Sequence, residues 1–468
     1  LFFKFDFVLA LTHLTFLLYK PFWYSHKVSI DSTLCISLLS LCHYQSNHFY
    51  MIHYDQFELA NGLQVIVHEN PHSPLVSVNV LYDVGSRDES LEKTGFAHLF
   101  EHLMFGGSLH IPSYDNIIHK AGGECNAFTS NDFTNYYNVL PVNNLETAFW
   151  LESDRMLSLN FNEQSLAVQK SVVIEEFKET HINQPYGDIW HKLLALSYQQ
   201  HPYRWPVIGA KISHISSASL ADVEAFFYRY YRPNNAILSI AGNVTKSQIA
   251  ELAKKWFGNI PRGPVNRRNL LQEAKQTEFR SLHTTADVPL DAIYLAFKMC
   301  GRSSSDYYAT DLLSDLLSTG NSSRLFQELI KEQQLFSSIQ AYGLGNFDVS
   351  LFCIQGKLRT GVTMEQAEAA IWQTLDKFSH TLVDDYELTK AKNKVETAIA
   401  FSEISLMNQA FLLAYHHLLG NIATINTEIA HYLAVSKHDI QRIARTILRK
   451  TNCSTIYYNK KQAIPANN

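Results

Sequence analysis

The chain has 468 residues, more than a single hydrophobic core usually organises, so we expect at least two domains. Apolar residues make up 46% and charged residues 18%, which is typical of a globular protein and excludes a disordered or fibrous one. The formal net charge is only -5, and no run of lysine and arginine is long enough to follow a phosphate backbone, so nucleic acid is excluded as an expected partner.

Residues 1–50 contain an apolar stretch from Phe7 to Leu18, which is shorter than the about 20 residues that a membrane span needs. The stretch is compatible with a signal peptide, but bulky residues stand where small ones should mark a cleavage site. Because Met51 directly precedes the first regular strand pattern, residues 1–50 are also interpretable as upstream or extraneous sequence. We expect them to lie outside the domains, and we predict no membrane span and a cytoplasmic location, with the periplasm as the alternative.

From Met51 onward the pattern is regular and predicts an α+β domain over residues 51–260. Alternating apolar residues on both sides of Asn61-Gly62 indicate a hairpin. A helical period over 95–105 is ended by two glycines. The other elements expected in this domain are strands over 75–82, within 127–140 and over 236–242, and helices over 114–121, 145–156, 165–180 and 246–256.

Residues 261–277 hold clustered proline, glycine, arginine and asparagine with little periodicity and are predicted to be a linker. Residues 278–468 repeat the same kinds of element and predict a second, homologous domain without a metal site. Its expected elements are strands over 292–299, 337–344 and 350–358, and helices over 307–317, 323–331 and from 364 onward. The predicted fold class is α+β, with two similar domains that each layer an antiparallel sheet with helices. The six cysteines are scattered and are expected to be free thiols.

The candidate metal-binding and catalytic residues lie in the helix predicted over 95–105. There His98, Glu101 and His102 follow the order H-x-x-E-H. On a helix the two histidines lie one turn apart on one face, with Glu101 beside them. Two histidines at this spacing are, by themselves, more often surface or capping residues. The rest of this helix is apolar, however, and burying two imidazoles and a carboxylate in it is costly unless a metal ion satisfies them. The order matches the inverzincin signature, and a catalytic zinc site needs a third protein ligand from elsewhere.

With this motif, the chain resembles the pitrilysin/insulinase family of zinc peptidases, in the branch that contains the mitochondrial processing peptidase and small bacterial homologues. The resemblance runs from about Met51 to about Asn459. It implies a metalloendopeptidase with one Zn²⁺ per chain, two domains that face each other like a clamshell, and extended peptides as substrates. It also implies that His98 and His102 bind zinc and that Glu101 is the catalytic base.

In this family the third ligand is a glutamate within a helix of the pattern V-x-x-E, which residues 171–177 match. Aligning the valines places the ligand at Glu176. Glu175 is the competitor, and because neighbours on a helix point about 100° apart, only one of the two can face the site. Two turns before Glu176, the family usually has a glutamate that supports the ligands, and this chain has Gln169 instead.

The segment 125–137 resembles the family's edge strand, which binds a substrate backbone by adding it to the sheet. The residues expected to contact substrate are Asn126, Ala127, Phe128 and Thr129. An ordinary aromatic-rich strand is the alternative interpretation. The segment 201–203 also fits the family and is interpreted as a feature of the fold.

A larger departure lies in the second domain, where active members carry an arginine and a tyrosine that bind the substrate carbonyl. Ile330 and Ser337 stand at those positions, and Arg324 belongs to an earlier part of the motif. We therefore expect a homologous subunit to supply the pair in a heterodimer, with a homodimer as the alternative. The predicted function is a zinc-dependent endopeptidase, and the alternative is a non-catalytic scaffold subunit of the same family.

Overall fold

The computed structural model describes residues 51–160, 162–266 and 268–461. The description below concerns the unit His53–Asn468. The signal-peptide and extraneous-segment interpretations of residues 1–50 lie outside the described residues. Among the helices that are described, no single one is both long and apolar enough to cross a membrane.

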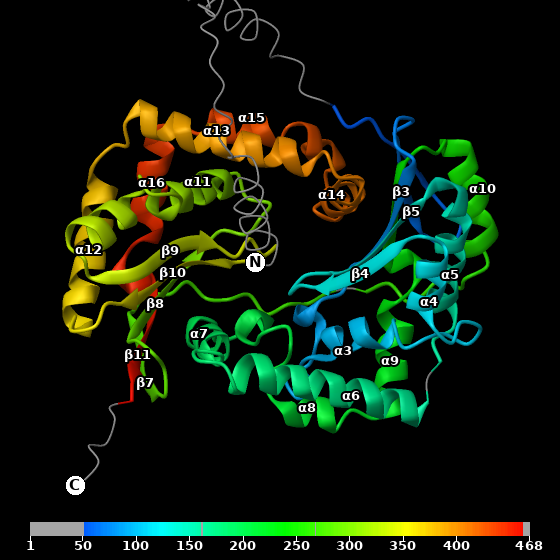
Figure 1. Ribbon diagram of the computed structural model, residues 1–468, viewed down its shortest axis with the longest axis horizontal. Helices are drawn as coiled ribbons and strands as arrows, with labels where there is room; N and C mark the ends of the chain where they lie inside the picture. The colour runs from blue at the N-terminus through cyan, green and yellow to red at the C-terminus, as the bar shows by residue number, and fades with distance from the viewer. Residues whose placement is uncertain (1–50, 161, 267, 462–468) are drawn as a thin grey trace, which may run out of the picture. The chain divides into compact units, whose positions relative to one another are not determined.

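A six-stranded sheet organises the first half of this unit (Figure 1). The strands follow the order β1-β2-β6-β3-β5-β4, so β4 lies at an edge. In chain order they are β1 (Asp55–Glu58), β2 (Gln64–Glu69), β3 (Leu75–Tyr82), β4 (Glu124–Thr129), β5 (Thr134–Pro141) and β6 (Ala236–Gly242). The predicted hairpin at Asn61-Gly62 is confirmed, since β1 pairs antiparallel with β2 and Gly62 has a φ of 91° that favours glycine.

Helices cover this sheet and bury a continuous apolar core against it. They are α3 (Phe96–Leu103), α4 (Tyr114–Lys120), α5 (Leu145–Leu157), α6 (Glu163–Phe177), α8 (Ile212–Ser216), α9 (Leu220–Tyr230) and α10 (Lys246–Phe257). The five helices predicted in this half are confirmed as α3, α4, α5, α6 and α10. The last turn beyond α6 is a π-helix (Lys178–Ile182), and not a continuation of the α-helix predicted to residue 180.

A five-stranded sheet organises the second half, in the order β7-β11-β8-β10-β9. Its strands are β7 (Arg280–Ala286), β8 (Ala292–Met299), β9 (Phe336–Gly343), β10 (Ser350–Leu358) and β11 (Cys453–Lys460). Its helices are α11 (Asp306–Ser318), α12 (Met364–His380), α13 (Asp385–Ser402), α14 (Leu406–Leu418), α15 (Glu428–Ala434) and α16 (Lys437–Ile447). The predicted fold class, two α+β domains, is confirmed.

Three details of the predicted fold are corrected. Each sheet is mixed, because β2 pairs parallel with β6 and β7 pairs parallel with β11. A parallel neighbour needs a long crossover connection, and here the chain between the paired strands holds helices and the other strands of the same sheet. The stretch from residue 364 does not remain helical, since β11 ends it as a strand. The helix expected over 323–331 is a π-helix, Phe326–Glu332.

Each sheet is also covered by a helix from the other half of the chain. Helix α7 (Ile189–Ser197) packs against β7, β8 and β11, where its Ile189, Leu193 and Leu194 join an apolar cluster with second-sheet residues. Helix α14 packs against β3 and β6 of the first sheet, beside which it lies in Figure 1. The two halves are therefore held together by an exchange of helices as well as by the connecting chain.

The corner between α13 and α14 carries a carboxyl group that titrates near neutral pH. Glu403 is half-buried there, and burial, together with the nearby Glu428, raises its pKa to about 7. In the unfolded chain the pKa of a glutamate is about 4.3. The folded protein thus binds this proton more tightly than the unfolded chain, so folding stability falls as the pH rises through this window.

We predict that Glu403→Gln removes part of this pH dependence. The melting temperatures of the wild-type protein and the variant should lie close together at pH 5, and the wild-type protein should melt at the lower temperature at pH 8. Calorimetry at the two pH values measures the difference. A difference that does not change with pH would contradict the assignment.

Candidate metal centre

Helix α3 presents its polar residues on the side away from the core. Phe96, Leu99 and Phe100 are almost fully buried in the first core, so the opposite face of the helix carries His98 and His102. The N-cap residue of the helix is Gly95, whose φ of 86° and approach to the Ile208 carbonyl leave no room for a side chain.

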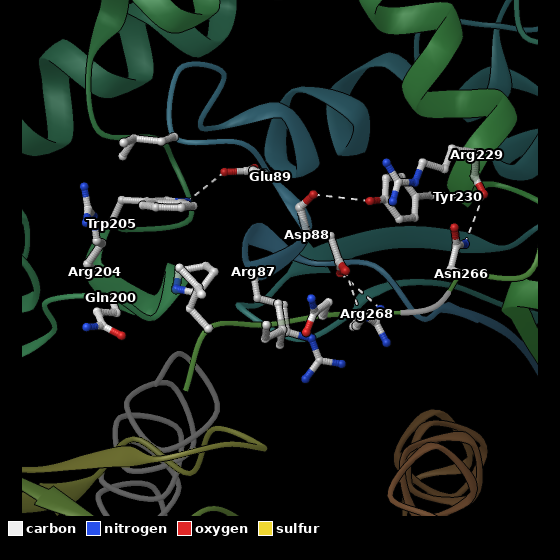
Figure 2. A pocket seen from close by; sticks show the side chains of 15 residues that line it. Arg87, Asp88, Glu89, Gln200, Arg204, Trp205, Arg229, Tyr230, Asn266 and Arg268 are labelled. Atoms are coloured by element: carbon white, nitrogen blue, oxygen red, sulfur yellow. Dashed lines mark hydrogen bonds and ion pairs between the residues drawn. The ribbon is translucent and has the colours of Figure 1, made fainter. Parts of the chain in front are cut away.

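Glu89 takes the place of a side-chain cap at this helix start. Its carboxylate accepts hydrogen bonds from Gly95 N and Ala97 N, both at 2.8 Å, and from Trp205 Nε1 at 3.0 Å. The Glu89–Trp205 contact is drawn in Figure 2. Burial raises the pKa of Glu89 to about 8, against the effect of the three N–H donors. The start of α3 is therefore fixed by the segment that precedes it and by Trp205.

Helix α6 packs against α3 and brings Glu176, in its last turn, to the two histidines. Glu176 Oε2 lies 3.3 Å from His102 Nε2, and Glu176 Oε1 lies 3.7 Å from His98 Nε2. One ligand atom from each of the three side chains lies within 4.8 Å of the others. Ligand atoms at zinc bond lengths in a tetrahedron are about 3.4 Å apart, so one ion fits between them.

The structure separates the two neighbouring glutamates. Glu175 is 71% exposed and pairs with Lys178 at 2.7 Å, whereas Glu176 is 39% exposed and faces the imidazoles. Only Glu176 belongs to the three-residue cluster. The geometry thus favours Glu176 over Glu175 as the third ligand, and the ligand role itself stays a prediction.

The charges of the cluster suit a cation. Burial lowers the pKa of His98 to about 4, although the Glu176 carboxylate raises it, so this imidazole is neutral at physiological pH. A hydrogen bond with His102 holds the pKa of Glu176 below its ordinary value. Two imidazole nitrogens and one carboxylate are a donor set that zinc takes readily. In the described part of the chain, Nδ1 of His98 is buried without a hydrogen-bond partner.

Glu101 lies beside the cluster but is held by β4. Thr129 Oγ1 donates a hydrogen bond to Glu101 Oε2 at 2.5 Å. Burial raises the pKa of Glu101. Thr129 is the last residue of β4, so the position of this carboxylate depends on the end of the edge strand.

The four residues predicted to contact substrate all lie on β4. Asn126 is exposed and its Oδ1 accepts a hydrogen bond from Ala127 N at 2.8 Å. Ala127 packs against the first core, and the ring of Phe128 lies 5.3 Å from that of Phe411 in α14. Within the described sheet, β4 is bonded to β5 alone, so its other edge is not paired with a strand. This arrangement can accept an added strand.

The structure does not bring the remaining predicted residues into the cluster. The half-buried Gln169 has its amide beside Gly106. Ile330 packs against the second core, and Ser337 in β9 donates to Lys357 O at 3.0 Å. Arg324 donates to both carboxylate oxygens of Glu387, at 2.9 and 2.7 Å, which gives it a structural role in the second domain.

Sequence reasoning missed His181, which contributes to the electrostatics of both His98 and Glu176. Its Nδ1 donates to Gly187 O at 2.9 Å, and its ring lies 4.9 Å from that of His191. It follows Glu176 by five positions, a spacing that an α-helix disfavours but that the π-helix here accommodates. A π-helix carries no sequence signal that would have identified it.

Two family models match consecutive parts of the chain. The model described as insulinase (peptidase family M16) matches residues 64–211, and the model described as peptidase M16 inactive domain matches residues 217–395. The chain belongs to the insulinase family, peptidase family M16.

Relatives within the family are named as zinc proteases. Zinc protease PqqE of Helicobacter pylori is 29% identical over 94% of this chain and 99% of its own length. A plant relative from Arabidopsis thaliana, named probable mitochondrial-processing peptidase subunit beta, mitochondrial, is 24% identical over 73% of this chain and 66% of its own length. The crystal structure of a protease from Helicobacter pylori has a TM-score of 0.82 at 28% identity and covers 88% of this chain and all (100%) of that one. The names of the relatives support a peptidase.

The two glutamates provide a matched test of the metal centre. We predict that Glu176→Gln weakens zinc binding at least tenfold, because an amide oxygen is a poorer, uncharged ligand. Glu175→Gln, one residue away on the exposed side of the same helix, should change zinc affinity by less than about twofold. Competition with a chromophoric chelator measures both affinities. Equal affinities for the two variants would rule out Glu176 as a ligand.

Proposed function

We propose that this chain is a zinc-dependent endopeptidase of the HxxEH type that hydrolyses peptide bonds in extended peptides. The observation that supports this most directly is the meeting of three ligand atoms, from His98, His102 and Glu176, between α3 and α6. Membership of a family whose relatives are named zinc proteases supports the same conclusion.

In this proposal each side chain has a separate task. A bound zinc ion would polarise the scissile carbonyl and acidify the attacking water. Glu101 is outside the ligand cluster and would take the proton of that water and return it to the leaving amine nitrogen. Burial raises the pKa of Glu101, which suits a carboxyl group that must both accept and release a proton.

The substrate would lie along β4. An extended peptide added to the outer edge of β4 would be held by backbone hydrogen bonds from 126–129, next to the end at which Thr129 touches Glu101. A folded protein cannot offer such a strand without unfolding locally. Unfolded peptides or leader segments are therefore the substrate class that this arrangement favours.

Replacing the proposed base should separate metal binding from turnover. We predict that Glu101→Gln retains zinc but lowers kcat by about 1000-fold or more, because the amide cannot accept the proton. Zinc content by elemental analysis and hydrolysis of a quenched fluorescent peptide measure the two properties. A variant with normal zinc and near-normal hydrolysis would exclude Glu101 as the base.

We further propose that the chain acts as the metal-bearing subunit of a pair. Ile330 and Ser337 stand where active relatives have an arginine and a tyrosine, so a homologous partner would supply these groups in a heterodimer, with a homodimer as the alternative. The naming of a plant relative as a beta subunit supports a paired arrangement.

This partner hypothesis can be tested within the chain itself. We predict that the double substitution Ile330→Arg with Ser337→Tyr raises the hydrolysis rate of the isolated chain by about tenfold or more, since one oxyanion donor is typically worth about 100-fold. The single substitutions serve as controls. If the unmodified chain alone already cleaves peptides at the rate of a complete enzyme, the need for a partner is refuted.

The second candidate function is a scaffold subunit without catalysis. It is favoured by the description of the second family model as an inactive domain and by the absent Arg/Tyr pair. Zinc content of the purified chain discriminates between the two, because a scaffold has no need to retain all three ligands. For the compartment we propose the cytoplasm, with the periplasm as the alternative.

A further inference from the structure

We propose that Asp132 is a positioning residue through which the second domain sets the end of the substrate strand β4, and so the proposed base Glu101. The inference rests on the proposed function. Asp132 lies in the β4–β5 turn and is neither a proposed metal ligand nor a proposed substrate contact.

Asp132 receives hydrogen bonds from three parts of the chain. It is 3% exposed, and its Oδ1 accepts from Arg87 NH1 at 2.8 Å and from the Tyr203 hydroxyl. Its Oδ2 accepts from the backbone N–H of Phe347 at 2.9 Å. Phe347 lies in the turn between β9 and β10 of the second sheet, so the carboxylate joins the two domains directly.

The contacts around Asp132 fix the second-domain turn in place. The backbone N–H of Asp348 donates to the Tyr203 hydroxyl at 3.2 Å, and Tyr198 donates to Val349 O at 2.9 Å. The ring of Phe133 lies 6.0 Å from that of Phe347. The turn is therefore held both by directional hydrogen bonds and by an aromatic contact.

A short and rigid path connects Asp132 to Glu101. Ser130 Oγ accepts hydrogen bonds from the backbone N–H groups of Asp132 and Phe133, both at 3.0 Å, and this closes the turn directly after β4. Thr129, the next residue back, donates to Glu101. A shift of the second-domain turn would thus move the last residue of β4, and with it the carboxylate of Glu101.

The same turn rests on the segment that leads into α3. Arg87 N donates to Asn131 O at 2.9 Å, and Asn131 Nδ2 donates to Ser86 Oγ at 2.9 Å. A Cβ on Gly85 would lie 2.5 Å from the Asn131 carbonyl, so glycine is required for this approach. Asp132 therefore lies where the second domain, strand β4 and the segment that precedes α3 meet.

A carboxylate is a specific choice for this position. Burying a carboxylate costs desolvation free energy unless its oxygens accept hydrogen bonds. Apolar side chains could hold the two domains together without this desolvation cost. Hydrogen bonds are directional, however, and three donors converging on one carboxylate define its position far more narrowly than apolar contact does. A narrowly defined position matters here, because the end of β4 must hold the proposed base Glu101.

The experiment compares Asp132→Asn with Asp348→Asn. Both remove one negative charge at the domain junction. Asp348 pairs with His201 at 3.4 Å but does not contact the β4–β5 turn through its carboxylate, so it is the matched control. Affinity for fluorescein-labelled casein peptides is measured by anisotropy in the zinc-loaded Glu101→Gln background, and kcat and KM are measured without that background substitution.

We expect Asp132→Asn to weaken peptide binding and raise KM about tenfold, with unchanged zinc content, whereas Asp348→Asn changes both by less than about twofold. Thr129→Val provides a further readout. Because Asp132 and Thr129 act on the same strand end, the double variant should lose less activity than the product of the two single losses. A purely structural role would lower the melting temperature without this coupling.

The inference is overturned if Asp132→Asn binds the peptides as tightly as Asp348→Asn, or if the losses with Thr129→Val simply multiply. Should Asp132→Asn not fold, Tyr203→Phe removes one of the three donors and keeps the ring, and a threefold or greater loss of peptide affinity is expected. Failure of the proposed function looks different, since the wild-type chain would then show no zinc-dependent hydrolysis. The peptide-affinity comparison needs no turnover and decides the role of Asp132 separately.

Discussion

The pairing of two imidazoles with one carboxylate, at the contact between α3 and α6, is the constraint on which the site depends. His98 and His102 can both face Glu176 only if α3 buries its apolar side and α6 crosses it at its last turn. The arrangement concentrates ligand atoms in a partly buried place where water satisfies them poorly. A divalent cation bound between the three side chains would remove that cost.

Much of the fold and of the site follows from local patterns in the sequence. The hairpin at Asn61-Gly62 and the helix that carries His98 are set by turn chemistry and by apolar periodicity, both of which act over a few residues. The choice between Glu175 and Glu176 needed more, because a helical pattern alone does not say which face meets α3. The structure supplies that information through the exposure of the first and the contacts of the second.

The features that could not be predicted are those that join distant segments. The parallel pairing of β2 with β6 depends on a crossover of well over a hundred residues, for which no local signal exists. Capping of α3 by Glu89 depends on a side chain from outside the helix, where the usual N-cap position holds Gly95. In the sequence, Asp132 is only one member of the segment 125–137, and its bond to Phe347 N appears only when both domains are in place.

The exchange of α7 and α14 also governs how the chain must assemble. The face of the first sheet on which α14 packs is covered by α14 only after this helix, near the carboxyl end, has been made and docked. Helix α7 is made earlier, but its apolar side is buried only when the second sheet has formed. Contacts between such distant segments delay folding, because the loop between them must close before the contact stabilises anything. Neither half is expected to reach its native state alone during synthesis, and the two sheets should form together late, as one cooperative unit.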